Sequence, residues 1–342
     1  MADRLRLSVV IPCRNEVLHI ENSVRSIINA GKLWEGDIHI YIVDGLSDDG
    51  TLDRIALLQQ EFDNVHLVVN EQQLTPYAFN LGIHVNAAHD YLLIVSSRHI
   101  LSPNYIQQAI TRLQENPEIW CVGGKVENVY LNQTGEIIAR AMGTTFGMGL
   151  DNFRTLQSSG YVDTVGTPLF PSWVFERIGY FDEELTRNQD DDFSFRIHKA
   201  GGKIYFDHEI PIQYFVRGSY DGLWRQFYQY GYWKVYVNTK HKTVTTLRQL
   251  APPFFVLYLF LLPFTWLLGV LIGMVSSLPL IAHLLLNMYY SMRNAKKISE
   301  FPQLIKTFWI LHLSYGLGYL RGLWEFVLMG RKPSDKQKRL SR

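Results

Sequence analysis

Apolar positions in the first hundred residues alternate between two spacings. Short continuous apolar runs are typical of buried strands, and apolar residues three or four positions apart are typical of helices that cover a sheet. The two patterns alternate four times, which predicts a parallel sheet with helices on both faces. The expected strands are residues 7–12, 38–43, 65–69 and 91–95, and the expected helices are residues 16–30, 51–61 and 76–89.

The pattern changes between residues 120 and 170, where short apolar pieces are separated by glycines. We interpret this stretch as a loop-rich region, because loops of such length in compact domains are usually functional or mobile. Beyond it, the spacing predicts helices over residues 174–178 and 191–199 and a strand over residues 203–206.

The longest uncharged stretch lies near the C-terminus. Residues 249–292 contain no Asp, Glu, Lys or Arg. As one helix they would extend about 66 Å, whereas a membrane span needs about 20 residues, so we expect two spans. We place them at about residues 253–274 and 278–292, with a turn near residues 276–279. A hairpin buried in a soluble protein is the alternative.

Charged residues reappear after this stretch. Residues 304–329 are apolar but include His312, Arg321 and Glu325, so we expect an in-plane or re-entrant helix there. Residues 331–342 hold six basic residues against one acid, and basic tails stay on the cytoplasmic side of a membrane. We therefore expect a cytoplasmic domain at residues 1–245, a membrane domain at residues 246–330 and a basic cytoplasmic tail at residues 331–342.

The composition limits which binding partners and which cellular compartment we expect. The net charge is +1, which argues against a nucleic-acid partner. Cys13 and Cys121 are too few for a metal motif or a disulfide framework, so we expect free thiols in a reducing cytosol. The first residues lack a secretory signal pattern, since Arg6 interrupts the apolar run, and we expect the soluble part to stay in the cytoplasm.

Polar residues follow the first two expected strands. Pro12, Arg14 and Glu16 end the first strand, and Asp44 and Ser47 end the second. Ligands of open parallel sheets bind at the carboxyl ends of the strands, so these residues predict a nucleotide pocket. Asp44 is placed to accept from a uracil N–H, or alternatively forms a turn. Glu16 is placed to accept from a ribose hydroxyl, although helix starts favour glutamate anyway.

Several segments, taken in order, resemble a known family. They are VVIPCRNE (9–16), VDGLSDDGT (43–51), AFNLG (78–82), GYFDEE (179–184) and RNQDDD (187–192), followed by Arg196. Their order and spacing are similar to those of inverting family 2 glycosyltransferases, over about residues 5–245. Within that family, the chain is most similar to membrane-associated bacterial enzymes of exopolysaccharide assembly, the succinoglycan-type transferases.

The resemblance implies an α/β fold of the GT-A type, a Rossmann-like and mostly parallel nucleotide-diphospho-sugar transferase domain with membrane helices after it. It implies transfer, with inversion, of a sugar from a UDP-sugar to a polyprenyl-linked or polysaccharide acceptor. The expected location is the bacterial inner membrane, with the catalytic domain in the cytoplasm and the lipid bilayer as a partner. We expect a single addition rather than processive polymerisation.

The resemblance also assigns residues. The family's general base lies six residues before an arginine, which here makes it Asp190, with Asp191 beside it. A carboxylate there can take the proton of the acceptor hydroxyl, although acids at a helix start also suit the helix dipole. Asn80 and Gly82 match the segment that lines the nucleotide, and Gly82 alternatively lets a helix approach the sheet.

A second matching segment is aromatic. Gln229 and Trp233 are in register with the family's Gln-x-x-Arg-Trp, and Tyr232 stands in place of the arginine. The segment is expected to hold the acceptor sugar by stacking, or to form an interfacial aromatic belt next to the membrane. The two interpretations are compatible.

The chain departs from the family where an Asp-x-Asp segment holds Mg²⁺ or Mn²⁺ on the donor diphosphate. Here the residues are Val95, Ser96, Ser97, Arg98 and His99. Hydroxyls do not supply the anionic oxygens that these cations prefer, whereas a guanidinium binds phosphate bidentately. We predict donor contacts from Ser97 and Arg98 and keep His99 as a candidate ligand of a weakly held cation.

Two hypotheses follow from this departure. In the first, the protein is an active transferase in which Arg98 partly replaces the metal. In the second, it is a non-catalytic GT-A-like subunit that binds nucleotide-sugar or glycan, or scaffolds a membrane polysaccharide complex. The retained Asp44 and Asp190 favour activity, because a decayed site is expected to lose its base as readily as its metal ligands.

Overall fold

The computed structural model describes residues 4–85, 89–149, 153–245 and 247–333, and the chain forms two compact units. Unit 1 consists of Met1–Glu127 and Leu156–Phe215, and unit 2 of Asn128–Thr155 and Val216–Arg342. The division differs from the domain boundary expected at residue 245. Most of the tail at residues 331–342 lies outside the described residues.

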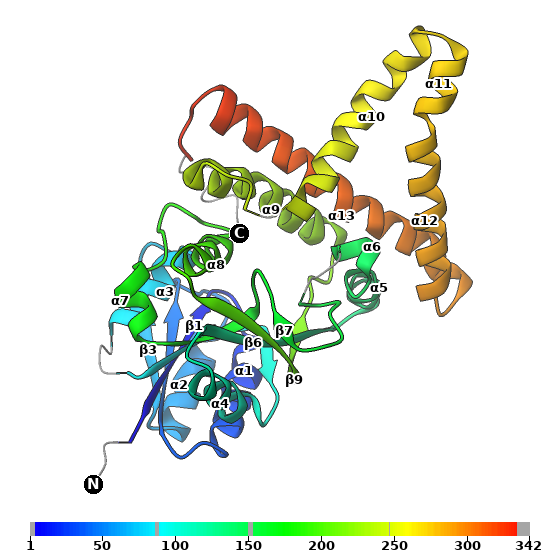
Figure 1. The fold of residues 1–342 in the computed structure, drawn as a ribbon. Coiled ribbons are helices and arrows are strands. Elements are labelled where there is room, and N and C mark those ends of the chain that lie inside the picture. The colour runs from blue at the N-terminus through cyan, green and yellow to red at the C-terminus, as the bar shows by residue number, and fades with distance from the viewer. Residues whose placement is uncertain (1–3, 86–88, 150–152, 246, 334–342) are drawn as a thin grey trace. The chain divides into compact units, whose positions relative to one another are not determined.

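Unit 1 contains a mixed sheet (Figure 1). Among the described residues the strand order is β3-β2-β1-β4-β8-β6-β9-β5, with β7 beside β9. Strands β1 to β4 are parallel to their neighbours within that group, as the alternating pattern predicts. The pairings of β4 with β8, β6 with β8, β5 with β9 and β7 with β9 are antiparallel. The bounds are β1 Arg6–Cys13, β2 Asp37–Asp44, β3 Val65–Val69, β4 Tyr91–Ile94, β5 His99–Leu101, β6 Ile119–Val129, β7 Gly160–Tyr161, β8 Gly166–Pro171 and β9 Lys203–Phe215.

Five helices of unit 1 correspond to expected ones, with α2 matching its predicted bounds, whereas α4 was not predicted. Helix α1 begins four residues later than expected, because the N–H groups of Asn15, Glu16 and Val17 bond to side chains of the loop after β2. The predicted helix over residues 76–89 ends at residue 84, and residues 86–88 lie outside the described part. The bounds are α1 Ile20–Gly31, α2 Thr51–Glu61, α3 Thr75–His84, α4 Tyr105–Glu115, α7 Trp173–Ile178 and α8 Gln189–Lys199.

The region expected to be loop-rich contains regular structure. Strand β6 begins it, helices α5 (Gln133–Met142) and α6 (Thr145–Met148) follow, and β8 ends it. Some glycines of this region serve packing and not loop flexibility: a Cβ on Gly124 would lie 1.8 Å from the carbonyl oxygen of Ile210. Glycine here allows neighbouring backbones to approach closely.

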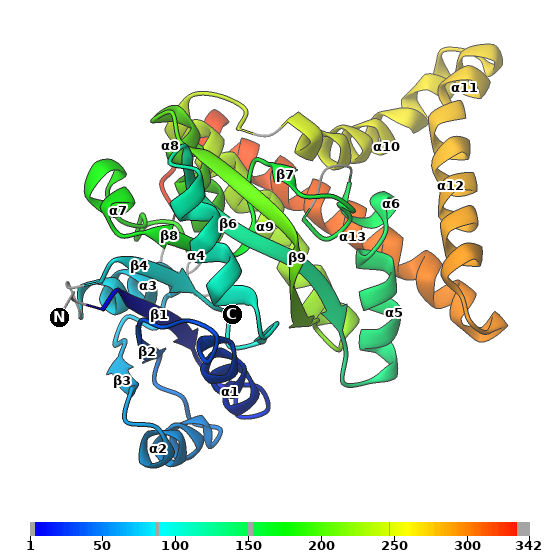
Figure 2. The same cartoon turned by 60° about the horizontal axis from the view of Figure 1, so that its bottom comes forward.

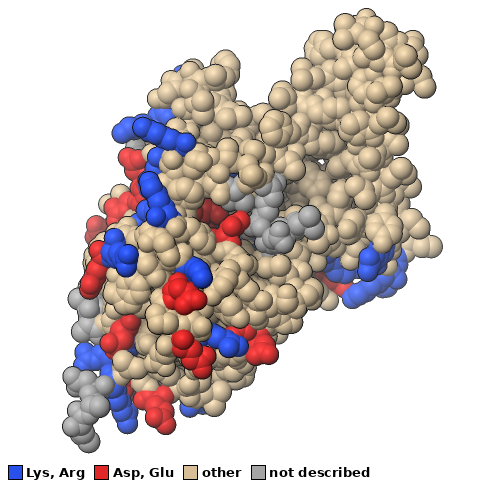
Figure 3. Space-filling view, in the orientation of Figure 1, with Lys and Arg blue, Asp and Glu red and all other residues tan. Residues whose placement is uncertain are grey.

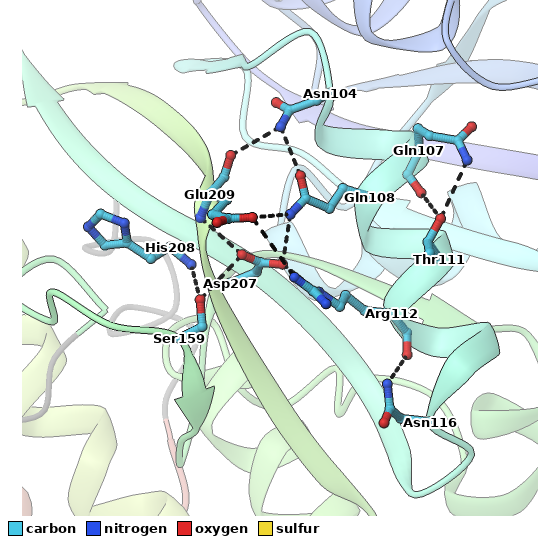
Figure 4. A network of polar contacts seen from close by, with 10 residues as sticks. All are labelled: Asn104, Gln107, Gln108, Thr111, Arg112, Asn116, Ser159, Asp207, His208 and Glu209. Atoms are coloured by element: carbon cyan, nitrogen blue, oxygen red, sulfur yellow. Dashed lines mark hydrogen bonds and ion pairs between the residues drawn. The ribbon is translucent and has the colours of Figure 1, made fainter.

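A buried polar network joins α4 to β9 (Figure 4). Asp207 of β9 is fully buried and accepts from Arg112 Nε at 2.9 Å and Gln108 Nε2 at 3.3 Å. The backbone N–H of Glu209 also donates to Asp207, at 2.9 Å. A buried carboxylate needs such partners, so this cluster fixes the helix on the strand.

Unit 2 is helical. Its helices, besides α5 and α6, are α9 Tyr220–His241, α10 Ala251–Leu267, α11 Val270–Ser276, α12 Leu278–Asn294 and α13 Phe301–Gly322, with a π-helical turn at Leu323–Leu328 and 3₁₀ turns at Leu247–Leu250 and Ile298–Glu300. Figures 1 and 2 both show α9 beside α13. A Cβ on Gly231 of α9 would lie 2.0 Å from the carbonyl oxygen of Tyr315, and one on Gly318 of α13 would lie 1.9 Å from that of Tyr228. The segment expected to be in-plane or re-entrant is therefore packed closely on α9.

An apolar hairpin extends from unit 2. The chain reverses after α10 at Gly269, whose φ of 130° suits glycine alone, and not at residues 276–279 as expected. Among the described residues, Val270–Asn294 is the helical segment long and apolar enough to cross a membrane, whereas Ala251–Leu267 is apolar but shorter. Leu267 is 81% exposed and Leu271 is 75% exposed. Figure 3 shows no charged residue on the visible face of the projecting part of this hairpin, and Lys or Arg side chains only at its lower end.

Candidate active site

The loops after β1 and β2 are bonded together at the carboxyl ends of the two strands. Cys13 and Asp44 are paired in register at these ends. Asn15 and Asp48 exchange two hydrogen bonds, Asn15 Nδ2 to Asp48 Oδ1 at 2.8 Å and Asp48 N–H to Asn15 Oδ1 at 3.0 Å. The N–H of Glu16 donates to Thr51 Oγ1 at 2.9 Å. The predicted pocket residues therefore stand on a defined scaffold.

Asp44 forms a tight turn with Ser47. The Ser47 hydroxyl donates to Asp44 Oδ1 at 2.5 Å, and the Ser47 N–H donates to Oδ2 at 2.9 Å. Asp44 is 3% exposed, so the turn that was the alternative interpretation is present. Each carboxylate oxygen has a further lone pair, so contact with a nucleotide base stays a prediction.

Pro12 and Arg14 are both half-buried at the end of β1. Their donor-side roles stay predictions. Burial, with the nearby Asp44 and Glu16 carboxylates, raises the pKa of the Cys13 thiol, so this cysteine stays protonated at neutral pH. The tip of β1 therefore offers no thiolate nucleophile.

Arg98 and Glu16 form an ion pair between the loops that follow β4 and β1. Arg98 Nε donates to Glu16 Oε1 at 2.9 Å, and the two side chains are 20% and 13% exposed. Strand β1 lies between β2 and β4, so the strand order reverses here, which is where doubly wound sheets bind ligands. Two residues predicted from separate motifs thus meet at this position.

The residues at the family's cation segment do not fit a divalent cation. Ser97 is buried, Arg98 places a guanidinium there, and His99 Nδ1 lies 2.6 Å from Thr167 Oγ1. Hard cations take several oxygen ligands, commonly carboxylates. Within the described ranges, no group of three or more His, Cys, Asp or Glu side chains is arranged to hold a metal ion.

Asn80 and Gly82 act in packing. Asn80 Nδ2 donates to the carbonyl of Phe181 at 2.9 Å and to Glu183 Oε1 at 3.0 Å, and Asn80 Oδ1 accepts from the Phe181 N–H at 3.0 Å. A Cβ on Gly82 would lie 2.4 Å from Val10 Cγ1. Asn80 thus holds the loop before α8, and Gly82 lets α3 approach β1, which was its alternative interpretation, while donor contacts from these two residues stay predictions.

The acidic run begins helix α8. Asp190 is exposed, whereas Asp192 is fully buried and accepts from Arg196 Nε at 3.0 Å. Asp191 accepts from Asn188 Nδ2 at 2.9 Å. Of the three carboxylates, Asp190 is the one most open to an incoming substrate, as a general base must be.

The aromatic segment lies in α9 of unit 2. Trp233 is 1% exposed and packs near Tyr236 and Phe326, with ring centroids 6.0 Å and 6.4 Å away. Tyr232, in place of the family's arginine, donates to Glu325 Oε2 at 2.6 Å. Trp233 offers no open ring face in this conformation, and acceptor contacts from Gln229 and Trp233 stay predictions.

The sequence pattern missed two residues that shape unit 1. Asp207 lies in β9 between apolar residues, where a carboxylate in a strand was the available signal of a buried network. Thr167 has a φ of 51°, and its carbonyl accepts from the Tyr105 hydroxyl at 2.5 Å. No local motif marks such a residue.

Comparison with known proteins gives consistent matches. The family model described as Glycosyl transferase family 2 matches residues 8–161. The one described as Glycosyl transferase family group 2 matches residues 91–292, more than half of the chain.

Two curated relatives match about two thirds of the chain. A dolichyl N-acetyl-alpha-D-glucosaminyl phosphate 3-beta-D-2,3-diacetamido-2,3-dideoxy-beta-D-glucuronosyltransferase of Methanococcus voltae is 29% identical over 232 residues, 66% of this chain and 71% of the relative. The succinoglycan biosynthesis protein ExoA of Rhizobium meliloti is 25% identical over 246 residues, 71% of this chain and 73% of the relative.

The fold is also found in a solved structure. The mannosyltransferase PcManGT of Pyrobaculum calidifontis, in complex with GDP-Man and Mn²⁺, aligns with a TM-score of 0.61. The sequences are 15% identical, and the alignment covers 94% of this chain and 88% of that one. The expected GT-A fold is confirmed.

Proposed function

Since the chain belongs to the family 2 glycosyltransferases, we propose that it transfers a sugar, with inversion, from a UDP-sugar to a lipid-linked glycan. The observation that carries this proposal is the exposed Asp190 at the start of α8, in the same unit as the strand ends that form the candidate nucleotide pocket. The named activity of the Methanococcus relative on a dolichyl-linked substrate supports a lipid-linked acceptor.

The proposed reaction is a single displacement. Asp190 takes the proton of the acceptor hydroxyl while its oxygen attacks the anomeric carbon of the donor. The bond from that carbon to the diphosphate oxygen breaks, and UDP departs with the electron pair. Attack opposite the leaving group inverts the anomeric configuration.

The proposed setting is the cytoplasmic face of a bacterial inner membrane. The apolar hairpin of α10, α11 and α12 exposes large uncharged side chains as far as residue 292, and Arg293 in the last turn of α12 is followed by Lys296 and Lys297. Such a hairpin suits a bilayer, and basic residues next to it suit the cytoplasmic side. A water-soluble donor and a lipid-held acceptor can meet there.

The test is UDP release by the purified full chain in detergent, with a panel of UDP-sugars and a lipid extract. We expect release with at least one donor, and a fall of about 100- to 10,000-fold in Asp190→Asn because the base is lost. Glu176→Gln, which removes an exposed carboxylate on α7, is the matched control. Equal activity of Asp190→Asn and wild type would contradict the role of Asp190.

The second candidate function is a non-catalytic binding or scaffold subunit. The observation that favours it is the segment at Ser97 and Arg98, where the family's cation-binding acids are absent. Nucleotide binding without UDP release, across the whole donor panel, would support this alternative.

A further inference from the structure

The Arg98–Glu16 pair occupies the position where a nucleotide diphosphate is expected at the sheet. Glu16 follows β1 and Arg98 follows β4, and these are the adjacent parallel strands at which the strand order reverses. We infer that the donor diphosphate is bound without a metal ion, by the Arg98 guanidinium, with Glu16 as its positioning residue. This inference rests on the proposed function.

The guanidinium has donors left for a ligand. Its Nε is used by Glu16 at 2.9 Å, and the hydrogen bonds found for Arg98 leave both terminal nitrogens for a ligand. A guanidinium presents its N–H groups in a planar fork that matches phosphate oxygens. With only 20% of the Arg98 side chain exposed, its charge is less screened by water than a surface charge.

The same residues disfavour a cation at this place. A fixed guanidinium repels Mg²⁺ or Mn²⁺, and the carboxylate next to it, Glu16, is already used by that guanidinium. Ser97 is 4% exposed and supplies a neutral hydroxyl. Neutral and cationic groups thus stand where the family places acids.

Glu16 acts through Arg98. One carboxylate oxygen, Oε1, holds Arg98 Nε, which fixes the direction of the terminal nitrogens. The other, Oε2, is buried and has no hydrogen-bond partner among the residues that the structure describes. Buried carboxylate oxygens normally accept a hydrogen bond, and leaving one without a partner costs free energy of folding. A purely structural role of the pair does not account for this cost.

The experiment is calorimetric binding of UDP and UMP to the full chain in detergent, after metal removal. We expect the UDP affinity to be the same with EDTA and with added Mn²⁺. We expect Arg98→Ala to weaken UDP binding about 10- to 100-fold, as lost charge-assisted hydrogen bonds do, and UMP binding less. The UDP affinity of Arg98→Lys, which keeps the charge but not the planar fork of N–H groups, should lie between those of wild type and Arg98→Ala. Arg25→Ala, which removes a surface-paired arginine of the same unit, should match wild type.

The role of Glu16 is tested by a double-mutant cycle. Glu16→Gln should weaken UDP binding in the wild-type background and have no further effect in Arg98→Ala, because the two act as one unit. Additive losses would overturn the positioning role.

The outcomes separate the two proposals. UDP binding that is lost in EDTA and restored by Mn²⁺, or that survives Arg98→Ala unchanged, overturns the metal-free site while the proposed function stands. If the wild type binds no UDP in either condition, the proposed function fails as well. The comparison of UDP binding in EDTA and in Mn²⁺ uses the wild type alone. It therefore tests the metal-free site even if a substitution impairs folding.

Discussion

Arg196 and Asp192 are joined one turn apart on α8, with Arg196 Nε donating to Asp192 Oδ2 at 3.0 Å. The same guanidinium donates to the backbone carbonyls of Ile178 at 2.7 Å and Tyr180 at 2.8 Å. The pair therefore closes the loop that precedes α8. The carboxylates of the acidic run therefore differ in role, since Asp192 is buried in this ion pair and Asp190 is exposed to solvent.

Asp192→Ala should therefore be a stability variant. Asp192 is fully buried, and breaking a buried pair by removing one partner typically costs about 3–5 kcal/mol in the free energy of unfolding. Chemical denaturation measures the change. Glu21→Ala, which breaks a surface pair with Arg25, should cost no more than about 1 kcal/mol. Similar losses in the two variants would argue against a structural role for Asp192.

Gly82→Ala should disturb the contact between α3 and β1. The added methyl would lie 2.4 Å from Val10 Cγ1 in the core, and such overpacking costs about 1–3 kcal/mol. Gly160→Ala is the matched control, because a Cβ there meets nothing within 4 Å. The midpoint of thermal unfolding should fall in the first variant only. A stable Gly82→Ala with impaired UDP binding would instead support its assignment to the donor site.

Glu300→Gln should show a pH-dependent effect on stability. Arg140 Nη1 donates to Glu300 Oε2 at 2.9 Å, and this bond, with the Lys296 N–H, lowers the pKa of Glu300 to about 2 from 4.5. Because this pKa is lower in the folded state, the ionised Glu300 carboxylate stabilises the fold. Its contribution is complete above the unfolded-state pKa and is lost as the pH falls through about 2. The unfolding temperature of the variant should fall below that of wild type at pH 7, and the difference should shrink toward pH 3.

The control for this prediction is Glu136→Gln. The Glu136 carboxylate pairs with Lys296 Nζ at 2.8 Å in a more exposed position, where the Glu136 side chain is 21% exposed and that of Lys296 is 64% exposed. Its substitution should therefore lower the unfolding temperature less than Glu300→Gln does at every pH. An equal loss for Glu300→Gln at pH 3 and pH 7 would show that the ionised carboxylate is not the stabilising species.

Leu271→Arg should weaken membrane association of the hairpin. Leu271 is 75% exposed in an uncharged segment, two residues after the turn at Gly269, so a charge there should cost less than the about 2.5–3.5 kcal/mol that insertion scales give for the centre of a span. Flotation with lipid vesicles measures the bound fraction. Leu52→Arg, at a site 40% exposed on α2, should leave it unchanged. Equal flotation of Leu271→Arg and wild type would contradict insertion of this segment.

Local patterns predicted the parallel half of the fold well. The bounds of α2 and β3 match because their periodicity is uninterrupted and turn residues flank them. The antiparallel half escaped prediction, because β9 runs to Phe215 through Asp207, which breaks its apolar pattern but is satisfied by Arg112 from a distant helix. Long-range compensation of this kind leaves no local signal.

The candidate site was predicted in part. Glu16 and Arg98 were found because each ends a strand, but their pairing depends on the neighbouring positions of β1 and β4, which spacing alone does not specify. Asn80 was assigned to the donor because it lies in a family motif, and the motif gave no sign that its amide also bonds Phe181 about a hundred positions away. Motifs thus located the region, and tertiary contacts decided the roles.

The most direct test of the account follows a labelled sugar from a UDP-sugar into lipid-extractable glycan, with wild type and Asp190→Asn run side by side. We predict label in the lipid fraction with wild type, with inverted anomeric configuration, and almost none with Asp190→Asn. No label from any donor, or a product with retained configuration, would contradict the proposed transfer.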